Sequence, residues 1–190
     1  GRVAVAGVAG DAGAGGAGAG ASGATQGWLA WLKADGKVSH QSLLGADAGL
    51  AALAQDGSHW LAAGHRVVDG TRRAWLLRLA SDGAVLWQRT STGSFDVRAM
   101  QHRGGGRMLI SGTANPNSAG VGDLWVAAVD EVGNRAWDWS YGVVGSERGA
   151  GVTALPDGGA LATGAAVKSG AGKGLLVRLD GWGHGSCGAA

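Results

Sequence analysis

Side chains that could bind a ligand gather in three stretches of the sequence, each placed between two segments that read as β-strands. Charged and amide side chains offer hydrogen bonds there, and Lys168 and Lys173 do so in the last stretch. The predicted binding residues of the first two stretches are His65, Arg66, Asp69, Arg72, Arg73, Asn115, Asn117 and Asp123. Because variable loops on a rigid scaffold commonly carry binding function, these stretches predict a binding surface for a protein or glycan ligand.

Patterns typical of catalysis or of metal binding are missing from the sequence. No G-x-S-x-G nucleophile elbow occurs. The Gly172-Lys173 pair lacks the further glycine and the Ser or Thr that a P-loop needs. Five histidines show no spacing typical of a metal site, and they are His40, His59, His65, His102 and His184. The sequence therefore predicts no catalytic residue, no metal site and no cofactor, and it favours a protein that is not an enzyme.

A Gly/Ala-rich stretch near the start contains the letters of a nucleotide-binding pattern. Residues Gly13–Gly18 match G-x-G-x-x-G and follow the apolar segment Val3–Ala6. A dinucleotide-binding fold would need a helix beginning at these glycines and an acidic residue about 20 positions later. More Gly and Ala follow instead, and then a segment headed by Trp28. We therefore predict that residues 8–26 form a low-complexity loop between two strands.

Acidic residues recur at three further places, Asp47, Asp96 and Glu147. These places fall at the expected crossings from one repeat to the next. An acid repeated in such a crossing more often holds a turn or pairs with a neighbouring arginine than catalyses a reaction. Arg98 and Arg148 are suitable neighbours, so a structural role is predicted for these acids.

Charge and composition exclude some classes of partner. The net charge is +2 with both signs mixed along the chain, which gives no reason to propose nucleic acid or an anionic membrane. No apolar run is long enough to cross a bilayer, so membrane insertion is not expected. The one cysteine, Cys187, is expected to be an inert thiol or to have a disulfide partner outside this chain. The sequence opens without Met or a signal peptide, which suggests a piece of a longer protein.

Four repeats organise the whole sequence. Trp28, Trp75, Trp125 and Leu175 hold equivalent places at steps of 47, 50 and 50 residues, and Gly36, Gly83, Gly133 and Gly183 each follow eight residues later. The repeats are predicted at 1–48, 49–96, 97–148 and 149–190. A period of this size, built from short strands and turns, is typical of β-propeller blades. We therefore predict an all-β fold, with residues 1–190 forming one β-propeller region. The five tryptophans at repeat-equivalent places are expected to pack between blades, and Trp28, Trp75 and Trp125 are expected to be substantially buried. The five are Trp28, Trp75, Trp87, Trp125 and Trp137.

Turn residues divide each repeat into four strands, here called a to d. In the second repeat these are Gly49–Ala54, Ser58–Ala63, Trp75–Leu79 and Ala84–Arg89, joined in part by Asp-Gly pairs that suit tight hairpins. Strand b is predicted to end at a glycine, which is Gly7, Gly64, Gly112 or Gly164. Glycine density and the lack of a 3.6-residue apolar period disfavour helix. Each complete repeat thus predicts a four-stranded antiparallel blade.

The position of each strand relative to the propeller axis follows from side-chain size. Strand a carries small residues such as Ala51 and Ala52, which suits the crowded axis, whereas strand d carries Trp87 and Trp137 and suits the periphery. The chain begins at strand b and leaves little sequence for the last strand d, which favours an open arc of a larger propeller. A closed four-bladed ring is the alternative. In an arc the outer faces of the first and last blades lie open, so we expect self-association.

The repeats resemble those of bacterial β-propeller proteins with a Trp-Leu-x-x-Leu-Asp-x-x-Gly-x-x-x-Trp strand pair and an Asp-Gly-Gly turn. That pattern stands here as Trp75–Leu79 with Gly83 and Trp87, and as Asp157–Gly159 running to Gly164. A weaker likeness to quinoprotein blades lacks the threonine of their motif. The resemblance implies a secreted or surface-exposed bacterial protein and no particular activity.

This sequence departs from the repeat pattern at two places, where His40 and Leu175 stand in place of Trp. The function predicted is a non-catalytic binding or scaffold module. Two alternatives stay open. The chain could be part of a propeller enzyme, quinoprotein-like or a hydrolase, whose active site lies outside it, or a purely structural surface module.

Overall fold

The computed structural model describes residues 3–10, 25–116, 122–142, 146–168 and 171–186. These residues form fifteen strands and no helix, and the strands make four antiparallel sheets in chain order.

The first sheet contains β1 (Val3–Ala9), β2 (Gln26–Leu32) and β3 (Val38–Ala46). The second contains β4 (Ala48–Asp56), β5 (His59–Val68), β6 (Thr71–Leu79) and β7 (Val85–Thr90). The third contains β8 (Phe95–His102), β9 (Met108–Ala114), β10 (Asp123–Val129) and β11 (Arg135–Tyr141). The fourth contains β12 (Ser146–Ala154), β13 (Ala160–Lys168), β14 (Ala171–Leu179) and β15 (Gly185–Ser186). The predicted all-β fold is confirmed.

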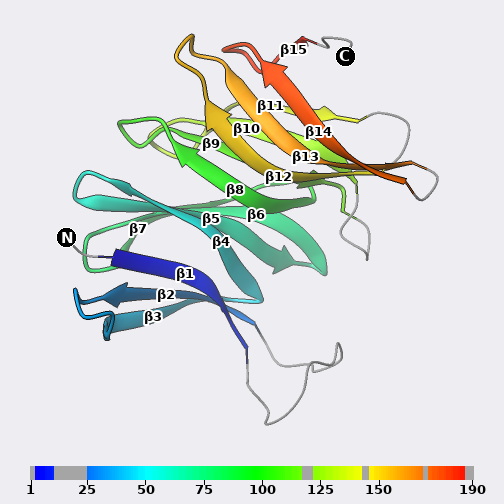
Figure 1. Ribbon diagram of the computed structural model, residues 1–190. Coiled ribbons are helices and arrows are strands. Elements are labelled where there is room, and N and C mark those ends of the chain that lie inside the picture. The colour runs from blue at the N-terminus through cyan, green and yellow to red at the C-terminus, as the bar shows by residue number, and fades with distance from the viewer. Residues whose placement is uncertain (1–2, 11–24, 117–121, 143–145, 169–170, 187–190) are drawn as a thin grey trace.

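The four sheets stack face to face in the order of the sequence (Figure 1). Strand β4 packs on β1 and β2 of the sheet before it, β8 packs on β4, β5 and β6, and β12 packs on β8, β9 and β10. The first and last sheets lie at opposite ends of the stack (Figure 1), and the two chain ends do not share a sheet. The described strands therefore do not form a ring closed by a sheet common to both ends.

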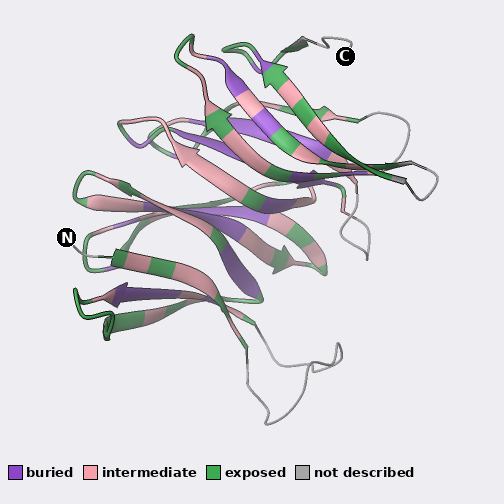
Figure 2. Ribbon diagram, viewed as in Figure 1, coloured by how far each residue is buried: buried purple, intermediate pink, exposed green. Residues whose placement is uncertain are grey.

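Apolar side chains fill the three spaces between consecutive sheets. Because side chains alternate across a strand, one face of β6 points to the first sheet and the other to the third. Trp75 and Leu77 accordingly pack with Leu29 and Trp31 of the first sheet, while Leu76 packs with residues of the third. A third cluster joins the third and fourth sheets. Figure 2 shows the buried stretches along the middle strands and exposed residues at both ends of the stack.

The same turn joins strands c and d in every sheet. Gly36, Gly83, Gly133 and Gly183 have φ values of 80°, 90°, 85° and 84°, a region that glycine occupies without steric cost. In each turn the glycine N–H donates to the carbonyl three residues before it. The first residue of the turn also donates to the carbonyl four residues later. The glycines that mark the sequence repeat thus correspond to one repeated backbone conformation.

Strand b does not end at its glycine, contrary to the prediction. Strands β5, β9 and β13 continue for two to four residues beyond Gly64, Gly112 and Gly164. Each of these glycines pairs with strand a at the edge of a β-bulge. The bulge brings a backbone carbonyl so close that a side chain at Gly112 would overlap the oxygen of Asp96. The glycine therefore admits a close backbone approach rather than ending the strand.

The tryptophans that recur on strand c differ in burial. Trp75 and Trp125 are 1% and 4% exposed, whereas Trp28 is only partly buried. All three point toward the side of the preceding sheet, as the clusters show for the second and third sheets. Within the described residues no sheet precedes the first, so Trp28 keeps part of its ring in solvent. The prediction of substantial burial is confirmed for Trp75 and Trp125 only.

Tryptophans of strand d pack against the next sheet, as their repeated places suggested. Trp87 lies against Gly133 of the third sheet, and Trp137 lies against Gly183 of the fourth. His40 holds the corresponding place in the first sheet, where its cross-strand neighbour Trp31 packs against Gly83 instead. The aromatic ring at this interface thus comes from strand c in the first sheet and from strand d in the next two.

Candidate binding surface

The residues predicted to form the first binding loop lie mostly on strands. His65 and Arg66 belong to β5, and Arg72 and Arg73 belong to β6. Only Asp69 lies in the turn, where it has φ 50° and precedes Gly70 with φ 71°. Two positive φ values fit the tight hairpin turn that matches strand twist. The predicted loop is therefore wrong as a loop, and its side chains are fixed by strand pairing instead.

The second predicted loop is only partly described. Asn115 follows β9 with φ 47°, and Asp123 is the first residue of β10, paired across the sheet with Ala114. Asn117 lies outside the described residues. Among the residues that the structure describes, no hydrogen bond or ion pair joins Asn115 or Asp123 to the group around His65. Asn115 and Asp123 therefore make no direct polar contact with that group.

The long Gly/Ala-rich loop is shorter than predicted. Val8 and Ala9 extend β1, and Gln26 begins β2, so the described strands take both ends of the predicted segment 8–26. Residues 11–24 of that segment lie outside the described residues, as does Cys187 near the other end of the chain. The predicted loop is thus confined to the segment between residues 9 and 26.

Alternation along the hairpin divides its charged residues between two faces. His65 and Arg72 share the face of Ala63 and Leu76, which pack against the third sheet. They reach Asp96 of β8: Arg72 Nη1 lies 3.1 Å from Oδ1, and His65 Nδ1 lies 3.9 Å from it. The third sheet thus completes an ionic cluster that begins on the second.

Arg98 completes this cluster from the third sheet. Its Nη2 lies 2.7 Å from Oδ2 of Asp96, so each carboxylate oxygen faces one guanidinium. The side chain of Asp96 is 3% exposed, while those of Arg72 and Arg98 are both 44% exposed. A buried carboxylate therefore holds two arginines whose outer N–H groups reach solvent. The predicted pairing of Asp96 with Arg98 is confirmed.

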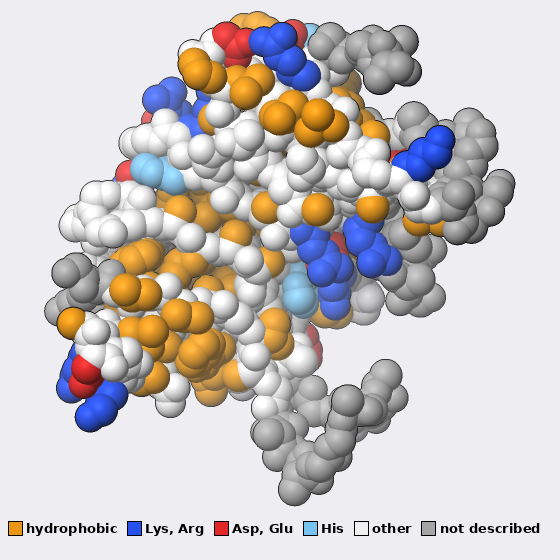
Figure 3. Space-filling model, viewed as in Figure 1, with side chains coloured by type: hydrophobic (Ala, Val, Ile, Leu, Met, Phe, Trp, Pro, Cys, Tyr) orange, Lys and Arg blue, Asp and Glu red, His pale blue; other side chains and the backbone are white. Residues whose placement is uncertain are grey.

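The cluster carries an excess of positive charge. Two guanidiniums share one carboxylate. Burial, and then the positive charge of Arg72, lower the pKa of His65 below its usual value, so this imidazole is neutral at pH 7. The outer surface is therefore cationic and presents planar donors, the geometry that suits carboxylate, sulfate and phosphate groups. Figure 3 shows Arg or Lys side chains gathered beside a histidine on this face of the molecule.

The other face of the hairpin adds a second basic pair. Arg66 and Arg73 are directly opposite each other on β5 and β6, a placement in which like charges repel. Within the described part of the chain, Nε of Arg73 is buried and has no hydrogen-bond partner. An anion between these side chains would relieve both the repulsion and the unsatisfied donor.

The three acids that recur at sequence crossings are not structurally equivalent. By strand register, Asp96 in the third sheet corresponds to Gly49 in the second and to Arg148 in the fourth. Glu147 lies one residue before that position. Asp47 is exposed and has φ 50°. The spacing of these acids in the sequence therefore did not show that the position of Asp96 differs from those of Asp47 and Glu147.

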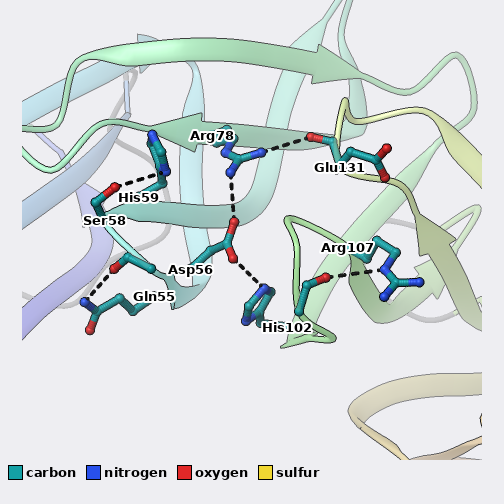
Figure 4. Close-up of polar contacts among 10 residues, drawn as sticks. Gln55, Asp56, Ser58, His59, Arg78, His102, Arg107 and Glu131 are labelled. Atoms are coloured by element: carbon teal, nitrogen blue, oxygen red, sulfur yellow. Dashed lines mark hydrogen bonds and ion pairs between the residues drawn. The ribbon is translucent and has the colours of Figure 1, made fainter.

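A second polar cluster lies at the opposite end of the same strands. Asp56 Oδ2 is 2.9 Å from Arg78 Nη2, and its Oδ1 is 3.0 Å from His102 Nε2 (Figure 4). Arg78 also donates to the carbonyl of Glu131, at 3.3 Å. These contacts join β4 and β6 of the second sheet to β8 and to the c–d turn of the third sheet. The side chain of Asp56 is 11% exposed, so this cluster fastens two sheets together rather than offering a surface.

A cavity of about 280 Å³ also lies between the second and third sheets. Its apolar wall includes Leu76, Ile110 and Trp125, and Arg89 and Asn134 are among its polar lining residues. The wall residues belong to the core that packs the two sheets together. We therefore assign this cavity to sheet packing.

Chemical groups for catalysis by a metal are not assembled in the described residues. No three His, Cys, Asp or Glu side chains come together there in a way that could hold a metal ion. The described residues likewise contain no helix long and apolar enough to cross a membrane.

Comparisons with known proteins give no family. No protein-family model and no curated protein matches this chain. Among solved structures, the chain is similar to a protein of unknown function from Bacteroides caccae, with 12% identity and a TM-score of 0.39. The similar region covers 80% of this chain and 65% of that one, so the chain spans less than two thirds of that protein's structure.

Proposed function

We propose that this chain is a segment of a β-propeller that serves as a non-catalytic binding or scaffold module in a secreted or surface-exposed bacterial protein. Its ligand carries carboxylate or sulfate groups on a protein or a glycan. The ligand binds at the end of the second and third sheets where Arg72 and Arg98 reach solvent. Stacked antiparallel sheets, three of them four-stranded, with Gly and Ala common on β4 and β12, support the propeller architecture.

One observation carries the choice of site: the buried carboxylate of Asp96 orients two half-exposed guanidiniums from different sheets. Arginines free in solvent lose side-chain entropy when they bind an anion. Arginines already held by Asp96 lose less, so they bind more tightly for the same contacts. A purely structural module has no need for paired arginines that point their outer donors into solvent.

Binding of two acidic polymers tests this proposal. Polyglutamate represents an acidic protein segment and polygalacturonate represents an acidic glycan, and each is titrated into the chain by calorimetry at low and moderate salt. We expect binding that weakens as salt rises, because exposed charges are screened. The variant Arg72→Gln/Arg98→Gln should bind at least 10-fold more weakly.

Two further variants separate a specific site from general charge. Arg135→Gln/Arg178→Gln removes the same charge at the other end of the sheets, where these arginines pair with Asp138 and Asp157, and should bind almost as well as the unaltered chain. Arg72→Lys/Arg98→Lys keeps a cation beside Asp96 and should fold normally, yet bind more weakly because Lys lacks the planar fork. An equal loss of affinity in the two double Gln variants would contradict the proposal. So would a failure of the unaltered chain to bind either polymer.

A further inference from the structure

Three aromatic side chains of β11 donate hydrogen bonds to three consecutive carbonyls of the fourth sheet. The carbonyls belong to the turn between β14 and β15 (Figure 1). The donors and acceptors are Trp137 and Gly181, Trp139 and Trp182, and Tyr141 and Gly183. Both indole bonds are 3.1 Å long. The third sheet therefore holds this turn residue by residue.

Asp180 fixes the same turn from within. Its Oδ1 accepts hydrogen bonds from the backbone N–H groups of Trp182 and His184, each at 2.8 Å. The backbone N–H and the backbone carbonyl of Trp182 therefore both have partners, while the residue is 74% exposed. A ring that is presented to solvent on a fixed backbone is preorganised for a ligand, because less conformational freedom is lost on binding.

The aromatic donors are a feature of this interface and not of the repeat. By strand register, Trp87 and Arg89 of the second sheet correspond to Trp137 and Trp139 of the third. Nε1 of Trp87 is buried and, among the described residues, has no hydrogen-bond partner. Arg89 donates to the carbonyl of its own neighbour, Gln88. The repeated fold therefore does not require indole donors or an exposed tryptophan at this turn.

The exposure of Trp182 does not depend on whether another sheet follows. Val132 and Asp82 hold the corresponding position, one residue before the turn glycine, in the third and second sheets. Val132 is 47% exposed and Asp82 is exposed as well, although a further sheet packs on each of their sheets. This turn position therefore faces solvent within the stack as well as at its end.

Polar groups lie beside the exposed indoles. Trp139 is 46% exposed, and the ring centre of His184 lies 5.5 Å from that of Trp139. His184 Nδ1 is 3.3 Å from Oδ2 of Asp180, and both side chains are more than half exposed. The backbone N–H of His184 lowers the pKa of Asp180, so this carboxylate is an acceptor at neutral pH. Flat aromatic faces thus lie next to a carboxylate and an imidazole.

We propose that Trp182, with Trp139 beside it, forms a stacking platform for a pyranose ring of a neutral glycan, and that Asp180 and His184 bind the hydroxyls of that sugar. The C–H groups on the face of a sugar ring carry small positive charges and are attracted to the negative face of an indole. The hydroxyls around the ring donate and accept hydrogen bonds, which suits a carboxylate and an imidazole.

The inference goes beyond the proposed function and does not depend on the arginine cluster. The platform lies at a c–d turn, whereas Arg72 lies on the hairpin that joins strands b and c. A neutral sugar also has no charge for the arginines to bind. A protein partner would need a broader desolvated patch around its anchoring side chains, but here the exposed indoles adjoin the exposed side chains of Asp180 and His184.

Calorimetric titration with three neutral hexasaccharides, cellohexaose, mannohexaose and chitohexaose, tests the proposal. We expect at least one of them to bind, with an affinity that is unchanged by added salt and by Arg72→Gln/Arg98→Gln. Trp182→Ala should bind it at least 10-fold more weakly, and Trp182→Phe should lose less because an aromatic face remains. Val132→Ala is the matched control at the corresponding turn position, and it should bind as well as the unaltered chain.

The urea midpoint separates binding from folding. It should be the same for Trp182→Ala as for the unaltered chain, because the ring is exposed. Failure of all three sugars to bind would overturn the proposal, and so would an equal loss of affinity in Trp182→Ala and Val132→Ala. Tetramethylammonium, a cation that binds aromatic faces, is the last probe. Tighter binding of this cation than of any hexasaccharide would also overturn the proposal, since the platform would then be a cation site.

Discussion

Trp75 on β6 donates a hydrogen bond from its indole Nε1 to Oε1 of Gln88 on β7, at 3.0 Å. The same relationship recurs in two other sheets, from Trp28 to Gln41 at 3.3 Å and from Trp125 to Asp138 at 3.1 Å. Each acceptor follows its tryptophan by 13 residues. Trp75 and Trp125 therefore serve both the apolar contact between sheets and a polar contact within their own sheet, while Trp28 makes the polar contact.

Replacing Trp75 with Ala should lower the free energy of unfolding by roughly 3–5 kcal/mol, the range for large aromatic truncations in cores. The ring is 1% exposed and packs against the first sheet, so the change leaves a cavity and an unpaired Gln88 amide. Urea unfolding followed by circular dichroism measures the loss. Trp182→Ala is the matched control, since that ring is 74% exposed, and it should change stability by no more than about 0.5 kcal/mol. Similar losses in the two variants would contradict the packing described for Trp75.

Asp56 and Asp157 occupy corresponding turns of the second and fourth sheets and should differ in their contribution to stability. Asp56 has a side chain that is 11% exposed and contacts Arg78 and His102. Asp157 is 53% exposed, pairs with Arg178 and accepts a hydrogen bond from the backbone N–H of Gly159. We expect Asp56→Ala to cost about 1–3 kcal/mol, because two partly buried partners are left without their acceptor. Asp157→Ala should cost less than about 1 kcal/mol, as is usual for exposed ion pairs. A larger loss for Asp157→Ala in the same unfolding assay would refute this ranking.

His65 should make stability depend on pH in the weakly acidic range. Burial lowers its pKa in the folded chain from the ordinary value of 6.5. Between the lowered pKa and 6.5 the unfolded chain therefore binds more protons than the folded chain, and stability rises with pH. The contribution is complete above pH 6.5 and is lost as the pH falls toward the folded-state pKa. The unfolding midpoint measured from pH 7.5 to 5 should fall less steeply in His65→Gln than in the unaltered chain, and parallel curves would contradict the assignment.

The outward faces of the first and fourth sheets should cause self-association. Val5 of the first sheet is 39% exposed and Leu176 of the fourth is 65% exposed. By strand register they correspond to Ile110 and Leu76, which are 0% and 8% exposed between sheets. Exposed apolar faces of this kind favour association. Analytical ultracentrifugation should therefore show a rise in average mass with concentration.

Charged substitutions identify the surfaces that associate. Val5→Glu and Leu176→Glu should each shift the chain toward monomer. Leu86→Glu places a charge at another exposed apolar residue, on β7 (51% exposed), and should leave association unchanged. If the Leu86 variant alone became monomeric, association would have to run through a different surface.

Local sequence signals predicted the all-β fold and the tight turns well, and the strand bounds less well. The Asp-Gly pairs and the turn glycines such as Gly83 require particular backbone angles, and this requirement acts over a few residues only. The alternation and spacing around Trp75 placed it on strand c for similar reasons, although β6 begins four residues earlier, at Thr71. All-β structure and the burial of Trp75 and Trp125 could therefore be read without knowing how the sheets pack.

Other features depended on partners distant in sequence. Gly112 read as the end of a strand, because nothing nearby in the sequence shows that a bulge of β8 brings the carbonyl of Asp96 against it. The sequence predicts a loop from His65 to Arg73, because many of these side chains are charged. In the structure only Asp69 and Gly70 form the turn, and the residues on either side pair as strands.

The sequence by itself determined that the fold is all-β, where the c–d turns fall and how often the pattern recurs, since backbone preference and side-chain alternation are local. Tertiary structure decided which side chains meet across sheets. Trp31 fills the space left by His40, and Asp96 gathers arginines from two sheets. Contacts of this kind depend on how one sheet is placed on the next, and that placement is set by the packing of whole faces rather than by any short stretch of residues.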